Sequence, residues 1–139
     1  MTALFRSLLL IGVALFSGNV IAQQDTVFWF AAPEVSASAG DTPIFLRFMT
    51  YGNASDVTVS LPANGGFTPI TLNIPSNSVD SINLTPFLAQ IESPAGDVVS
   101  NNGIRITATE EISAFYELRN PGNKEIFSLK GNKGLGDNY

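Results

Sequence analysis

The chain contains no cysteine and no histidine. Without cysteine it cannot be a disulfide-stapled scaffold, and without either residue it lacks Ser-His-Asp catalysis, Cys-His catalysis and nearly all zinc sites. It also lacks the Gly-x-Ser-x-Gly, phosphate-loop and dinucleotide-binding motifs. The single adjacent carboxylate pair, Glu110-Glu111, is expected in an exposed turn rather than in a glycosidase site. We therefore expect no enzyme, no cofactor and no metal site.

Positive charge is also scarce. The sequence has seven Lys or Arg against twelve Asp or Glu, with no basic run. Because nucleic-acid binding depends on basic side chains meeting phosphates, nucleic acid is not an expected partner. The segment 97–102 is rich in Asp and Asn, but it has no EF-hand spacing and these residues are ordinary turn formers. Whether its oxygens bind calcium is left open by the sequence.

The first residues have the pattern of a secretory signal peptide. Arg6 precedes the apolar run 7–16, and Val20-Ile21-Ala22 forms a cleavage site before polar residues. The run is shorter than the ~20 apolar residues that span a bilayer. We predict a signal peptide over residues 1–22, a mature chain beginning at Gln23, no membrane span after cleavage, and an extracellular or cell-surface location. An uncleaved anchor and a buried helix are the alternatives.

Residues 23–139 alternate between short β-rich runs and clusters of Gly, Pro, Asn, Asp and Ser. Apolar and polar residues alternate most strictly in 56–61 and 70–74, and turns recur about every 8–12 residues. This pattern predicts one all-β domain, an antiparallel β-sandwich with one short connecting helix. The expected strands are 27–31, 44–51, 56–61, 70–74, a weaker run ending at residue 84, 103–108, 112–118 and 125–129.

The connecting helix is expected over residues 84–91. Thr85 is a suitable N-cap, and Pro86 would occupy the first helical position, where its missing N–H costs nothing. Four apolar residues have the spacing of a helix face that lies on a core: Leu84, Phe87, Leu88 and Ile91.

Residues 103–118 predict a β-hairpin. Its two strands would be joined by the three-residue loop Thr109-Glu110-Glu111, so that Ile106 pairs with Ala114 and both apolar sets share one face.

The run 44–51 is apolar on both of its faces. Such a strand is either central to a covered sheet or exposes a binding patch. Trp, Tyr and Arg dominate interface energetics, so the binding hypothesis names four candidate ligand-binding residues: Trp29, Phe45, Arg47 and Tyr51. A cluster of Trp29, Phe45 and Tyr51 exposed to solvent would favour binding, and full burial of these side chains would favour a structural spacer that binds nothing.

Three segments resemble the IgGFc-binding protein N-terminal domain family of large Bacteroidetes-type surface proteins: Asn102–Thr109, Ile112–Tyr116 and Leu135–Tyr139. The resemblance implies an extracellular binding or adhesion module rather than an enzyme. Members of that family continue beyond the Leu-Gly-x-x-Tyr segment. We therefore expect a bacterial fragment whose β-domain is truncated at its C-terminus, with an unpaired strand edge through which it self-associates and with Phe127 and Tyr139 incompletely buried.

The resulting expectation is an exported cell-surface or secreted adhesion module for glycan or protein ligands. The alternative is a structural spacer of a larger surface protein that itself binds nothing.

Overall fold

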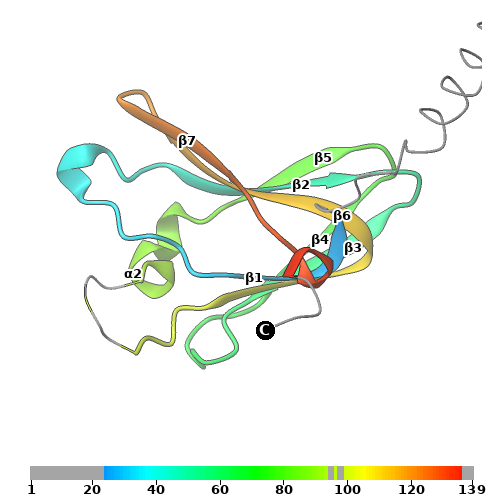
Figure 1. Ribbon diagram of the computed structural model, residues 1–139, viewed down its shortest axis with the longest axis horizontal. Coiled ribbons are helices and arrows are strands. Elements are labelled where there is room, and N and C mark those ends of the chain that lie inside the picture. The colour runs from blue at the N-terminus through cyan, green and yellow to red at the C-terminus, as the bar shows by residue number, and fades with distance from the viewer. Residues whose placement is uncertain (1–23, 94–95, 97–98, 136–139) are drawn as a thin grey trace, which may run out of the picture.

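Seven antiparallel strands form one continuous sheet in the computed structural model, which describes residues 24–93, 96 and 99–135 (Figure 1). The strands follow the sequence-predicted runs closely, except at the long sixth strand. They are β1 (Asp25–Phe30), β2 (Ile44–Thr50), β3 (Ser55–Ser60), β4 (Ile70–Ile74), β5 (Val79–Asn83), β6 (Ile104–Asn120) and β7 (Asn123–Ser128). Short helical segments are the 3-10 turns η1 (Ala37–Ala39), η2 (Thr85–Phe87) and η3 (Asn132–Leu135), and the helix α2 (Leu88–Ile91).

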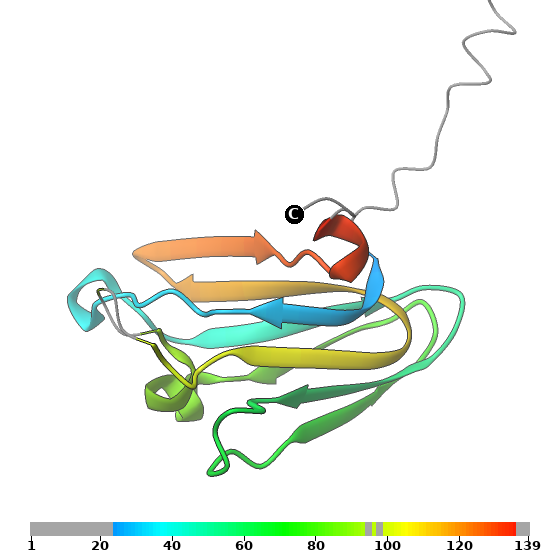
Figure 2. The ribbon, with the colours of Figure 1, turned by 60° about the horizontal axis from the view of Figure 1, so that its bottom comes forward.

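Strand β6 organises the sheet because it pairs with four other strands along its 17 residues. Its first part lies between β1 and β3, and its second part lies between β2 and β7. The remaining strands extend the two parts, β4 beside β3 and β5 beside β2. Figure 2 shows β6 turning from one half of the sheet into the other, which gives a nearly closed, barrel-like sheet.

The predicted hairpin over 103–118 is therefore wrong. Ile106 pairs with Phe28 and Val59, not with Ala114. Ala114 instead lies opposite Phe48 of β2.

The bend in β6 explains this error. Residues 109–111 contain no Gly or Asn, and none of them adopts the left-handed backbone that a three-residue hairpin loop needs. The buried apolar residues have even numbers both before and after the bend, since Ile104, Ile106 and Ile112 are all fully buried. One strand can therefore cross the bend and still direct even-numbered side chains inward on both sides of it, while residues 109–111 of the bend are exposed.

The core fills the space between the two halves of the sheet. On β2 the alternation holds as predicted, because Ile44, Leu46 and Phe48 are fully buried and the residues between them are only partly buried. Tyr116 of β6 is also fully buried, and its ring lies 5.0 Å from that of Phe30. Among the described residues, the Tyr116 hydroxyl has no hydrogen-bond partner.

The predicted helix over 84–91 is present as η2 followed by α2. Leu84 and Ile91 are fully buried, and the ring of Phe87 packs edge-on against Phe67 at 5.2 Å. The predicted N-cap is wrong, because Thr85 lies inside the first turn. Its Oγ1 instead accepts a hydrogen bond from the Ile44 N–H at 2.9 Å and so ties the helical segment to β2.

The end of the described chain is held against the start of β1. Asp25 Oδ2 accepts a hydrogen bond from the Lys133 N–H at 2.7 Å, and Gly131 forms a bridge with Phe28. The signal peptide predicted over 1–22 and the segment 136–139 lie outside the described residues.

Candidate functional site

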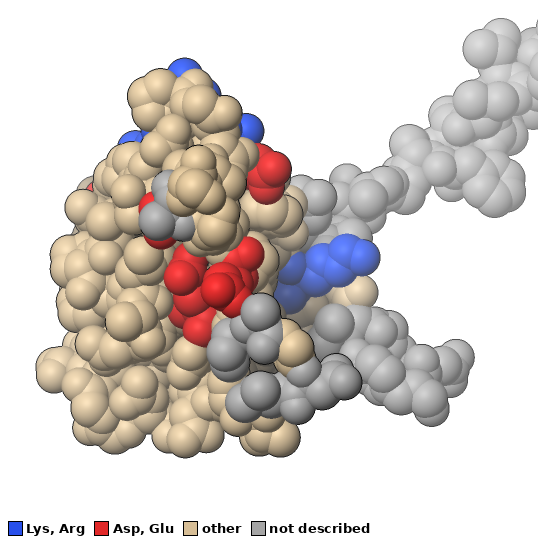
Figure 3. Space-filling view, turned by 90° about the vertical axis from the view of Figure 1, so that its left-hand side faces the viewer, with Lys and Arg blue, Asp and Glu red and all other residues tan. Residues whose placement is uncertain are grey.

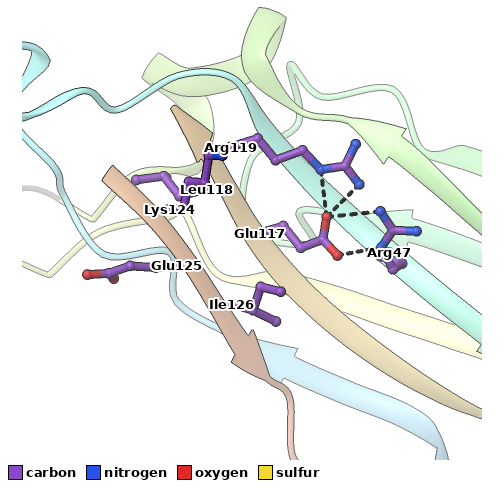
Figure 4. Close-up of a pocket in the computed structure, with 7 residues that line it drawn as sticks. All are labelled: Arg47, Glu117, Leu118, Arg119, Lys124, Glu125 and Ile126. Carbon is purple, nitrogen blue, oxygen red and sulfur yellow. Dashed lines mark hydrogen bonds and ion pairs between the residues drawn. The ribbon is translucent and has the colours of Figure 1, made fainter. Parts of the chain in front are cut away.

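The candidate site is a groove on the outer face of strands β2, β6 and β7 (Figure 4). It has a volume of about 510 Å³. The strand register places Glu117 of β6 between Phe45 of β2 and Ile126 of β7, so the outward side chains of three strands meet there. The lining residues are Arg47, Glu117, Leu118, Arg119, Lys124, Glu125 and Ile126.

One carboxylate in this groove binds two guanidinium groups. Arg47 Nε donates to Glu117 Oε1, and Arg47 Nη2 donates to Oε2 at 3.2 Å. Arg119 Nε also donates to Glu117 Oε2 at 2.7 Å, and Arg119 Nη2 lies 2.5 Å from the same oxygen. The Glu117 side chain is only 7% exposed, whereas both arginines remain partly exposed. Two positive charges therefore share a single negative charge.

The pKa values at this cluster favour its charged form. The hydrogen bond from Arg47 holds the pKa of Glu117 below its usual value against the opposing effect of burial, and Arg119 adds to this lowering. The hydrogen bond to Glu117 in turn raises the pKa of Arg47. Both shifts favour the ionised forms of Glu117 and Arg47. Because two guanidinium groups share one carboxylate, the cluster has an excess of positive charge.

An aromatic ring and an aliphatic side chain flank the arginines. The guanidinium carbon of Arg119 lies 4.2 Å from the centroid of the Phe45 ring, which is the distance of a cation–π contact. This contact orients Arg119 and covers one face of the ring. On the next strand, Ile126 is 68% exposed and gives the groove an apolar margin.

The groove is a basic site on an acidic protein. Three of the six Lys and Arg residues in the described part of the chain line it, namely Arg47, Arg119 and Lys124, with only two carboxylates beside them. The whole chain carries a net charge of −5. In the view of Figure 3, acidic side chains gather near the middle of the visible face, with basic side chains at the top and one beside the acidic group. The groove lining therefore has one more basic than acidic side chain, whereas the whole chain is negatively charged.

The structure brings together two of the four sequence-predicted binding residues. Phe45 and Arg47 follow one another on the outer face of β2 beside Glu117. Tyr51 lies past the other end of β2, and its hydroxyl is 2.8 Å from Ser113 Oγ. It lines a separate hollow of about 370 Å³ with Gln24, Gly52, Asn53, Glu110 and Glu111.

Trp29 lies elsewhere, on the outer face of the other half of the sheet. It is 54% exposed and pairs with Arg105, whose guanidinium is 5.7 Å from its ring. The four side chains are neither fully buried nor clustered, so the structure shows neither the expected docking face nor the full burial expected of a spacer. A ligand-binding role for all four residues stays a prediction.

Sequence reasoning missed Glu117, Arg119, Lys124 and Ile126. The available signal was that Glu117 and Arg119 occupy the odd positions of a strand whose even positions are apolar, which puts both on the outer face. Their meeting with Arg47 could not be seen, because 70 residues separate Arg47 from Glu117 in the chain.

No protein-family model, curated protein or solved structure matches this chain. Within residues 24–93, 96 and 99–135, no three His, Cys, Asp or Glu side chains are grouped so that they could hold a metal ion. In the same part of the chain, no helix is long and apolar enough to cross a membrane. Asp97, in the segment considered for calcium, lies outside the described residues.

Proposed function

We propose that this protein is an exported cell-surface or secreted adhesion module that binds glycan or protein ligands, and that the ligand places a carboxylate in the arginine groove. The observation that carries the proposal is the sharing of Glu117 by Arg47 and Arg119. A guanidinium presents five donors in a planar fork, and the two arginines direct only part of theirs to Glu117. A ligand carboxylate would accept from the rest and neutralise the excess charge.

The surroundings of the arginines favour an acidic protein segment over a glycan. Sugars commonly need an open aromatic face, and Arg119 covers one face of Phe45. Ile126 offers an aliphatic surface instead, next to the exposed backbone of β7. An extended peptide with Glu or Asp side chains can use both features.

The proposal also includes the fold type of the domain and its export from the cell. We infer that the two halves of the bent sheet serve as the two layers of a β-sandwich, and that residues 1–22 are a signal peptide. Cleavage before Gln23 would leave every strand intact, because β1 begins at Asp25. The resemblance of residues 102–116 to the IgGFc-binding protein N-terminal family supports an extracellular setting. Mass spectrometry of exported material tests this, and an extracellular species that retains residues 1–22 would contradict it.

The second candidate function is a spacer module that binds no ligand. The separation of Trp29 from Phe45 and Arg47 favours it, because these side chains do not form one broad aromatic platform in the part of the chain that the structure describes.

Calorimetric titration with three probes separates these functions: a Glu-rich peptide, an oligouronate and a neutral oligosaccharide. We expect the peptide to bind, and Arg47→Gln to weaken its binding at least about tenfold, since charge-assisted hydrogen bonds contribute about 1.5–3 kcal/mol each. Arg105→Gln is the matched control, because Arg105 is a basic residue on the other half of the sheet.

Each outcome of this titration decides between the proposals. Binding of the oligouronate alone would make the ligand an acidic glycan. Absence of binding by all three probes would favour the spacer function. Equal effects of Arg47→Gln and Arg105→Gln on peptide binding would show that the peptide binds outside the arginine groove.

A further inference from the structure

Strand β7 has one free edge. It pairs with β6 on one side, and within the described part of the chain no strand pairs with its other side. Nearly all of its residues are exposed, including Ile126 at 68% and Phe127 at 37%, which agrees with the expected partial exposure of Phe127. The β6–β7 hairpin also projects from the body of the molecule (Figure 1). The free edge is therefore accessible along its length.

The ladder with β6 determines which backbone groups this edge presents. The Leu129 N–H donates to the Ala114 carbonyl at 2.9 Å, next to the pair formed by Phe115 and Ser128. In an antiparallel ladder, this bond makes Ser128 a position whose own N–H and C=O point away from β6, and such positions recur at every second residue. The free N–H and C=O groups thus belong to Lys124, Ile126 and Ser128, which are arranged symmetrically about Ile126.

We propose that a second copy of this chain pairs with β7 through these groups, in an antiparallel register centred on Ile126. Ile126 then lies opposite Ile126 of the second copy, and Lys124 lies opposite Ser128 of the second copy. Every free N–H and C=O group at the three positions gains a partner, and the two exposed isoleucine side chains cover one another.

The two alternative pairings of β7 with its copy, shifted by two residues in either direction, are less favourable. A shift of two residues toward the hairpin turn puts Glu125 opposite the same residue of the second copy, and like charges directly opposite are destabilising. A shift in the other direction leaves the backbone groups of Lys124 without partners. The Ile126-centred register avoids both costs, since Glu125 then lies opposite Phe127 of the second copy.

The symmetry of the free groups is what favours a second copy over an unrelated strand. A two-fold pairing also consumes the free edge of both copies, so it ends in a closed dimer at this edge rather than in a growing chain. In that dimer the sheet of one copy continues into the sheet of the second copy through the two paired β7 strands. One arginine groove then lies on each side of the two-fold axis. The pairing uses Ile126 and the free backbone groups of β7, so in the dimer a ligand of the groove is left with Arg47, Arg119 and Lys124.

Size-exclusion chromatography with light scattering tests the dimer, on protein expressed from the full 139-residue sequence. We expect a dimer that Ile126→Lys converts to a monomer, because two lysines would then face each other. Val79→Lys is the matched control, since Val79 is 51% exposed on another edge strand, β5, and its substitution should leave the dimer intact. Circular dichroism confirms that each variant is folded.

Two further measurements fix the register. A mixture of Ile126→Lys and Ile126→Glu proteins should form heterodimers, because opposite charges then meet at the two-fold axis. As the chain has no cysteine, mixed Glu125→Cys and Phe127→Cys proteins should cross-link on mild oxidation, whereas neither should cross-link alone. A monomeric wild-type protein, an Ile126→Lys dimer, or cross-linking of either cysteine variant by itself would overturn the proposal.

Discussion

Gly131 packs directly against the side chain of Asp25, so that a Cβ added to the glycine would lie 2.6 Å from the Asp25 carboxyl carbon. The same carboxylate accepts the Lys133 N–H, which holds η3 against the start of β1. We expect Gly131→Ala to lower the free energy of unfolding by about 1–3 kcal/mol, because this backbone contact has no room for a methyl group. Urea-induced unfolding followed by circular dichroism measures the change.

Gly65→Ala is the control for that substitution. A Cβ at Gly65 meets no atom within 4 Å, so the change should stay within about 0.5 kcal/mol. Equal losses from both alanines would show that the contact with Asp25 is not the cause.

Replacing Glu117 with Gln should destabilise the fold by about 1–3 kcal/mol, because the two arginines lose their shared carboxylate. The effect should depend on pH. The pKa of Glu117 is lowered by folding, so its contribution is complete above the unfolded value of about 4.3 and is lost as the pH falls through the folded value. Chemical denaturation at pH 7 and in acid should therefore show a smaller acid loss for Glu117→Gln than for wild type. Glu125→Gln, on exposed β7, should leave the acid loss unchanged.

Tyr116→Phe should leave stability at pH 7 unchanged or raise it, because it removes a buried hydroxyl that has no partner among the described residues. Burial, with the nearby charge of Glu92, raises the pKa of Tyr116 to about 12. An unfolded tyrosine ionises near 10, so the unfolded state releases its proton first and the free energy of unfolding falls between about pH 10 and 12. Thermal melts across this range should show a weaker alkaline loss for Tyr116→Phe, and identical profiles would contradict the assigned burial.

Thr85→Val should cost about 1–2 kcal/mol, since the Ile44 N–H would lose its acceptor. Thr85→Ser keeps the hydroxyl and should retain most of the stability. If Val and Ser had the same effect in denaturant titrations, the hydroxyl would not be the link between η2 and β2.

Local alternation was enough to predict most strands of this fold. In runs such as 56–61 and 70–74, apolar and polar residues alternate within a few adjacent positions, so the strand can be predicted from those residues alone. The bend of β6 was missed because Glu110-Glu111 has the polarity of a loop. The even-numbered apolar positions continue from Ile106 to Ile112 and Ala114 across this segment, and this continuity indicates a single strand.

Only part of the arginine groove could be predicted, because its residues come from strands that are far apart in the sequence. Phe45 and Arg47 stand out because they make the outer face of an apolar strand aromatic and charged. Glu117 and Arg119 acquire their role only through pairing between β2 and β6, which depends on the three-dimensional register. Trp29 was grouped with them on residue type alone, and the strand order puts it on the other half of the sheet.

The position of β6 in the chain also affects when the protein can fold. Strands β1, β2 and β3 all need β6 as a neighbour, yet β6 begins only at Ile104. A growing chain that has reached residue 83 possesses five strands, three of which lack their shared partner β6, and such distant pairings form slowly. The sheet therefore cannot close before the residues of β6 have been synthesised. This late-arriving central strand would give the proposed export machinery time to engage the chain before the sheet closes.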